Sequence, residues 1–262
     1  MKVITAIAAT TIGEAIRRKV LLVILLIGVL LLGIAPGLQA LSARQERTVL
    51  KSFIFGTMQL TAVMIAVILT VYIIPNEIER RTIYTILCKP VRRWQLLVGK
   101  YLGAIGALGL MIAMMTGLSI LLYWKFQEGA PMSDLAGIAQ VALMYYVQTC
   151  LLAAVAISLS TFLPPLVNIF VSLGLYLVGT LFSSVFESIS SQQGTHPMVK
   201  GFASLVGSVL PNFSRFNVQN LEINTQQIGN VTRYYIDAAV YGIVYIVGVL
   251  IVGMLVFENR EV

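Results

Sequence analysis

The sequence has few charged residues and few of the side chains that usually carry catalysis. Charged residues make up 11% of the 262 positions, and the chain has one histidine and two cysteines. A metal site or a histidine-based nucleophile needs companion residues, but His196, Cys88 and Cys150 have none in any known motif spacing. We therefore expect that the chain is not an enzyme, with no catalytic residue, no metal site and no cofactor of its own.

Apolar residues, in contrast, are abundant and gather in long runs. Hydrophobic residues make up 58% of the chain, and its mean hydropathy is +0.89. Runs of ~18 or more apolar residues are long enough to cross a bilayer as helices. The sequence predicts an all-α polytopic membrane protein with one transmembrane domain over residues 1–262. Its six predicted spans are about 20–38, 53–75, 101–124, 135–160, 165–187 and 236–257.

The basic residues predict how these spans are oriented. Six spans place both termini on one side, and that side carries eleven of the 18 lysines and arginines, including the two densest clusters. Because cytoplasmic loops carry an excess of lysine and arginine, both termini and the loop at 76–100 are predicted to be cytoplasmic. The net charge of +7 is attributed to orientation and contact with anionic lipid, and not to nucleic-acid binding.

Two segments outside the spans are predicted to lie at the membrane surface. Apolar residues recur at helical spacing over 4–16, which favours an amphipathic helix in the cytoplasmic interface, although a cytoplasmic extension of the first span remains open. A second apolar stripe, over 198–210, predicts a small external helical insert between the last two spans, followed by a polar tail that begins at Asn212. The predicted anchors at the membrane interface are Arg17, Arg18, Lys19, Trp94 and Lys100.

The chain also lacks its own means of driving transport. Its only Gly-Lys pair, Gly99-Lys100, precedes Tyr101 instead of serine or threonine, and Trp94 replaces the first glycine of a phosphate-binding loop. The central parts of the predicted spans contain no ionisable residue, whereas ion-driven transporters keep such residues near the midplane. An ATP-driven role would therefore need a separate ATP-binding subunit and a surface on which that subunit docks.

Residues 76–90 have the pattern expected of such a docking surface. Asn76 and Glu79 resemble a capping box at the start of a short helix, and Pro90 ends it. Between them, Ile83, Ile86 and Leu87 form an apolar stripe. The alternative is that this charge serves membrane topology alone and meets no partner.

The loop also resembles a motif of a known family. Glu79-Arg80-Arg81-Thr82, Leu87, Pro90-Val91, Arg93 and Gly99-Lys100 are similar to the cytoplasmic loop of ABC-2 type transporter permeases. Arg81 departs from this pattern, because many members have glycine there. The sequence PNFSRFN at 211–217 is similar to a segment of the subgroup that resembles the nitrous-oxide-reductase maturation permease.

This resemblance implies a function and a set of partners. The chain would be the permease subunit of an ATP-binding-cassette exporter in the bacterial inner membrane. Two permease copies, as a homodimer or a heterodimer, would pair with two ATP-binding subunits that hold ATP and Mg. A short cytoplasmic coupling helix between spans 2 and 3 would dock on the ATPase. The implied coupling interface comprises Glu77, Glu79, Arg80, Arg81, Thr82, Tyr84, Leu87, Pro90 and Arg93.

Some alternatives remain open at this stage. An ABC-type subunit that transmits force to an external process would have the same pattern. An ATP-independent secondary transporter or channel would need an energy source or pathway that the sequence does not indicate. The glycines at 99, 103, 106 and 109 have two readings as well: they permit a close helix contact, or they serve general packing.

Overall fold

The computed structural model describes residues 2–40, 46–75, 93–127, 131–181, 198, 210–219 and 231–258. In this part of the chain the regular elements are all helices. They are α1 (Lys2–Arg17), α2 (Lys19–Ala40), α3 (Glu46–Val71), α6 (Arg93–Phe126), α7 (Met132–Leu159), α8 (Pro165–Leu181), the 3-10 helix η1 (Phe213–Phe216) and α12 (Val231–Glu258).

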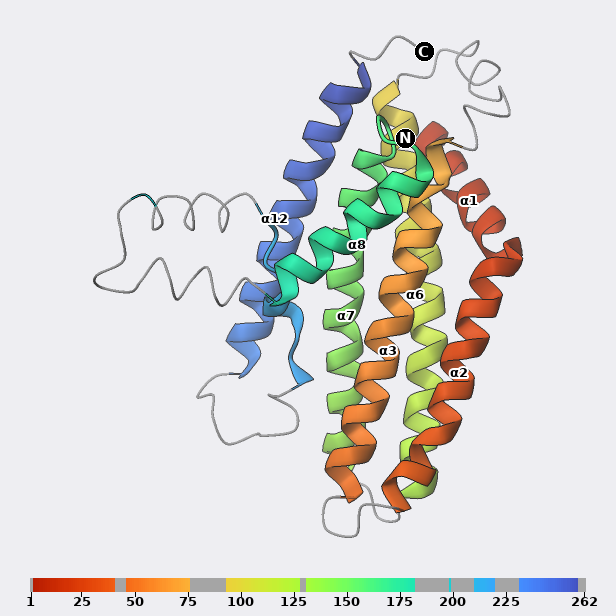
Figure 1. The fold of residues 1–262 in the computed structure, drawn as a ribbon, viewed down its shortest axis with the longest axis vertical. Coiled ribbons are helices and arrows are strands. Elements are labelled where there is room, and N and C mark those ends of the chain that lie inside the picture. The colour runs from red at the N-terminus through yellow and green to blue at the C-terminus, as the bar shows by residue number, and fades with distance from the viewer. Residues whose placement is uncertain are drawn as a thin grey trace.

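The long helices form a bundle around two buried members, α3 and α7. Helix α3 packs against α2, α6 and α7, and α7 packs against α3, α6 and α12 (Figure 1). The alanines at 153, 154 and 156 in α7 are fully buried, and such small residues let neighbouring helices approach closely. The outer helices α2 and α12 expose long apolar stripes, as expected for surfaces that face lipid.

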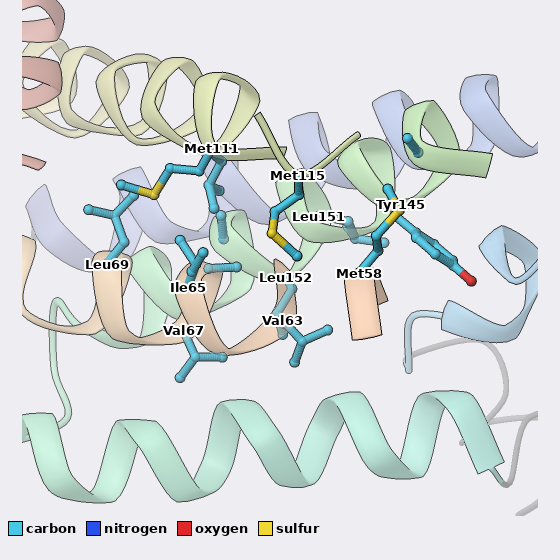
Figure 2. Close-up of a cluster of buried hydrophobic side chains, with 14 of the residues drawn as sticks. Met58, Val63, Ile65, Val67, Leu69, Met111, Met115, Tyr145, Leu151 and Leu152 are labelled. Atoms are coloured by element: carbon cyan, nitrogen blue, oxygen red, sulfur yellow. The ribbon is translucent and has the colours of Figure 1, made fainter. Parts of the chain in front are cut away.

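The centre of the bundle is closely packed. Met111 and Met115 of α6 lie against the side of α3 that carries Ile65 and Leu69 (Figure 2). The void beside Met58, Met115 and other residues of this cluster has a volume of only about 10 Å³. That volume holds at most one water, so α3, α6 and α7 form a continuous core.

Five of the predicted spans are confirmed as helices that are long and apolar enough to cross a membrane. All five begin earlier than predicted, and the largest differences are at α3, which starts at Glu46, and at α6, which starts at Arg93. In α3 and α6, the charged residues of the first turn were assigned to loops, although each helix begins before its apolar segment. The remaining predicted span, 165–187, corresponds to α8, whose described part is only 17 residues long, and residues 182–187 lie outside the described residues.

The turn between α7 and α8 is held by side-chain hydrogen bonds. Asn168 Nδ2 donates to the Ala156 carbonyl oxygen at 2.9 Å, and Ser172 Oγ donates to Asn168 Oδ1 at 2.9 Å. The chain reverses direction here, and α8 then crosses the bundle obliquely instead of running alongside α7 (Figure 1).

Helix α1 is separate from α2, with a break at Arg18. The Arg18 backbone N–H bonds to the Ala15 carbonyl at 3.1 Å, and α2 then leaves in a new direction (Figure 1). Helix α1 packs mainly on α6 and only slightly on α2. It is therefore not a straight extension of the first span, whereas its predicted position at the membrane surface stays a prediction.

The start of α1, the end of α3, the start of α6 and the end of α12 lie at one end of the bundle (Figure 1). We call this the coupling end, because the loop that connects α3 to α6 must leave and re-enter there. The opposite end holds the end of α6 and the starts of α3 and α7 (Figure 1). This arrangement agrees with the predicted placement of both termini on one side.

Candidate coupling end and its braces

Most of the residues predicted to contact an ATPase lie outside the part of the chain that the structure describes. Those at 77–90 lie outside the described residues, so their helix and its contacts stay predictions. Arg93 is the first residue of α6, and Pro75 closes the helical segment that begins at Glu46. The structure thus describes the two helices that flank the loop, and it places both flanks at the coupling end (Figure 1).

Beside the loop, α1 lies on a row of glycines in α6. A Cβ atom added at Gly99 would lie 2.9 Å from Ile7 Cβ, one at Gly103 would lie 2.5 Å from Thr11 Cβ, and one at Gly106 would lie 2.9 Å from Ile12 Cδ1. Each of these distances is too short for real carbon atoms. The first of the two readings is therefore confirmed for these glycines: they permit a close helix contact, and the partner helix is α1.

The fourth glycine of the row faces another helix. A Cβ at Gly109 would lie 3.2 Å from the ring of Tyr146 in α7, whose hydroxyl donates to the Ile105 carbonyl at 3.1 Å. Tyr101 of α6 likewise donates to the Cys150 carbonyl of α7 at 3.1 Å. Helix α6 is therefore tied to α1 on one side and to α7 on another.

Lys100 occupies a different environment from the other predicted anchors. Its side chain is 5% exposed, and its Nζ lies 4.0 Å from a carboxylate oxygen of Glu14, which is 61% exposed. At this separation, and with one partner in solvent, the pair adds little stability by itself. Arg17, Lys19 and Trp94 are exposed and Arg18 is partly exposed, while their role as anchors at the membrane interface stays a prediction.

The opposite end of the bundle holds a charged cluster that joins three helices. Lys51 Nζ of α3 lies 3.1 Å from Asp134 Oδ1 of α7, and Tyr123 Oη of α6 donates to Asp134 Oδ2 at 2.8 Å. The lysine also stands 5.8 Å from the centre of the Tyr123 ring. The sequence analysis missed this cluster, although Lys51 and Asp134 flank two predicted spans at the same end.

We expect Asp134→Asn to destabilise the protein. The amide oxygen still accepts the Tyr123 hydrogen bond, but it leaves the Lys51 ammonium, on a side chain 10% exposed, without its carboxylate. A buried polar group that loses its partner costs about 1–3 kcal/mol, and a charged group costs more. Thermal unfolding in detergent would show a lower midpoint, and adding Lys51→Met should restore part of the loss. Strictly additive losses in the double variant would contradict the pairing.

Single polar side chains inside the bundle form hydrogen bonds between elements. Gln59 Nε2 of α3 donates to Tyr176 Oη of α8 at 3.0 Å. Gln148 Nε2 of α7 donates to the Phe213 carbonyl oxygen of η1 at 3.1 Å. Such bonds between helices are favourable in lipid because water is absent. They connect α8 and η1 to the buried helices.

The segment that contains η1 corrects the prediction of a polar tail. Phe213, Phe216 and Val218 are fully buried. The Asn212 side chain accepts the Ser214 backbone N–H at 3.1 Å and so caps η1, while the Asn212 backbone N–H donates to Tyr241 Oη of α12 at 2.9 Å. The error arose because the polar residues were counted without noticing that Phe213 and Phe216 lie three residues apart, the repeat of a 3-10 helix, and so share one buried face.

Taken together, these helices are those of a multi-pass membrane protein. The family model described as ABC-2 family transporter protein matches residues 5–262. The chain belongs to this family, which makes it the membrane permease component of an ABC transporter and implies an ATP-binding subunit as its partner. A search of curated proteins finds no match.

Proposed function

We propose that the chain is the permease subunit of an ABC exporter, in which ATP hydrolysis by a separate subunit drives substrate across the membrane. The observation that supports this most is the continuity of α6. It begins at Arg93, directly after the predicted coupling loop, and runs without a break to Phe126. Its 34 residues span about 51 Å at 1.5 Å per residue, which exceeds the ~30 Å hydrocarbon core.

Helix α6 thus connects the coupling end to the charged cluster at the opposite end. The α1 contact braces its first turns, and Tyr123 near its last turn binds Asp134. A helix is stiff because its backbone hydrogen bonds are internal, so a displacement at Arg93 reaches Tyr123. We propose that closure of the ATP-binding subunits moves α6 together with α1, and that this movement shifts the cluster formed by Lys51, Tyr123 and Asp134.

The proposed assembly contains two permease copies, which form a homodimer, and two ATP-binding subunits that hold ATP and Mg. The proposed coupling residues are those at 77–93 given above, and both termini face the cytoplasm of a bacterial cell. Helix α1 is proposed to lie in the cytoplasmic interface, anchored by its basic end. The resemblance of residues 211–217 supports a subgroup similar to the nitrous-oxide-reductase maturation permease.

Purification of the tagged chain from its native membranes tests the proposal. We expect an ATP-binding protein to co-purify in equimolar amount, and its ATPase rate to change when the complex enters lipid vesicles. The chain reconstituted alone should show no transport. Solute movement through the chain alone, with no ATP-binding protein recovered, would favour a secondary transporter or channel instead.

A further inference from the structure

An open-sided apolar groove lies between the end of α7, the oblique helix α8 and α12. Its volume is about 710 Å³, within the ~300–1,000 Å³ range of small-molecule sites. Among the residues that line it, only Ser158 and Tyr245 carry a hydroxyl, and none is charged. Ser158 Oγ is already engaged with the Val249 carbonyl oxygen at 3.3 Å. The groove therefore offers an apolar ligand a lining with little competing polarity.

Two glycines of α12 explain how the groove forms. A Cβ at Gly253 would lie 2.5 Å from Ser158 Oγ, so this glycine lets α12 approach α7 closely. A Cβ at Gly248 would meet no atom within 4 Å, although Gly248 also lines the groove. Helix α12 is thus held close to α7 at Gly253, while α8 runs obliquely away from α7 (Figure 1). The groove lies between these helices and includes Gly248 in its lining.

The position and length of the groove indicate what occupies it. Its lining on α12 runs from Val244 to Val256, which is about 18 Å at 1.5 Å per residue. One leaflet of the hydrocarbon core is about half of ~30 Å, so the groove has the length of one leaflet. Val244 and Val252 line it while being 67% and 60% exposed, which makes its rim continuous with the lipid-facing stripe of α12.

We propose that this groove binds one acyl chain of a bilayer phospholipid from the leaflet at the coupling end. The acyl chain lies along α12 beside Gly248, with its methylene groups against Val249 and Val252. Water does not fill an apolar space of this kind, and the open side of the groove faces lipid. The inference rests on the membrane-spanning fold, and it holds whatever cargo the exporter carries.

Photolabelling of the full chain in vesicles tests the site. The probe is a phosphatidylglycerol with a diazirine in one acyl chain, in vesicles of phosphatidylethanolamine and phosphatidylglycerol. We expect labelling of Val249, inside the groove, to exceed that of Ile251, which is 50% exposed and does not line the groove. Gly248→Leu fills the space beside the chain and should lower Val249 labelling about tenfold, the effect of excluding about two methylenes.

The same substitution at Gly33 of α2 is the matched control, because a Cβ there also meets no atom within 4 Å. It should leave the ratio of Val249 to Ile251 labelling unchanged, and both variants should elute as the wild type does in size-exclusion chromatography. Equal labelling of Val249 and Ile251 in the wild type would mean bulk lipid only and would overturn the proposal. A ratio of Val249 to Ile251 labelling that Gly248→Leu leaves unchanged would also overturn it. The same holds if Val252→Cys forms a disulfide between two copies of the protein while Val249 stays unlabelled.

Discussion

Replacing Glu79 with arginine or Leu87 with aspartate is expected to abolish coupling to the ATP-binding subunit while the chain stays in the membrane. Glu79→Arg would remove the carboxylate of the predicted capping box and reverse the charge at the docking surface. Leu87→Asp would put a carboxylate in the apolar stripe. Removing one partner of a close interfacial contact of this kind costs roughly 2–5 kcal/mol, so binding should fall at least about tenfold. The measurement is the amount of ATP-binding subunit retained on the tagged chain, together with the ATPase rate of the complex.

Lys125→Glu provides a control of the same chemical type. Lys125 is an exposed residue in the last turn of α6, at the end of the bundle away from the loop. Its charge reversal should leave retention of the ATP-binding subunit unchanged. Wild-type coupling in either Glu79→Arg or Leu87→Asp would contradict the assignment of residues 76–90 as the coupling helix, whatever the control shows.

Gly103→Leu is expected to force α1 away from α6. A Cβ at this position would lie 2.5 Å from Thr11 Cβ and 2.8 Å from the Ala8 carbonyl oxygen, and the backbone oxygen has no rotamer by which to withdraw. Overpacking of this kind typically costs 1–3 kcal/mol. We expect a lower unfolding midpoint in detergent than that of the wild type.

The control for this experiment is Gly117→Leu on the same helix. A Cβ at Gly117 would meet nothing within 4 Å, and leucine favours a helix by roughly 0.8–1.0 kcal/mol over glycine. Gly117→Leu should therefore keep or slightly raise the unfolding midpoint. An equal effect of the two substitutions would show that α1 does not depend on the glycine row.

The spans could be predicted because each is a long apolar run, and such runs have few alternatives in lipid. Their ends were harder to predict, since α3 and α6 extend through charged turns that resemble loops. The row of glycines in α6 was noticed in the sequence, yet its partner depends on how two distant helices meet. Spacing alone does not supply that information, so the contact of α1 with α6 came only from the structure.

Two parts of the site were missed for different physical reasons. The cluster of Lys51, Tyr123 and Asp134 combines residues from three helices, and each of them alone looks like an ordinary residue at the edge of a span. The buried part of the 210–219 segment was taken for a polar tail because Asn212, Ser214 and Arg215 dominate its composition. The three-residue spacing of Phe213 and Phe216 matches the repeat of a 3-10 helix and would have indicated that these two side chains share a buried face.

The hydrogen bond between Gln148 and Phe213 also has a consequence for synthesis. The glutamine enters the membrane with α7, but its partner carbonyl lies 65 residues further along the chain. At ~5–20 residues per second, the ribosome adds those residues in roughly 3–13 s, and during that time the buried amide of α7 has not met its final acceptor. The bundle is therefore completed only when the segment before α12 arrives, so a nascent chain cut off between the two would expose an unfinished surface to membrane quality control.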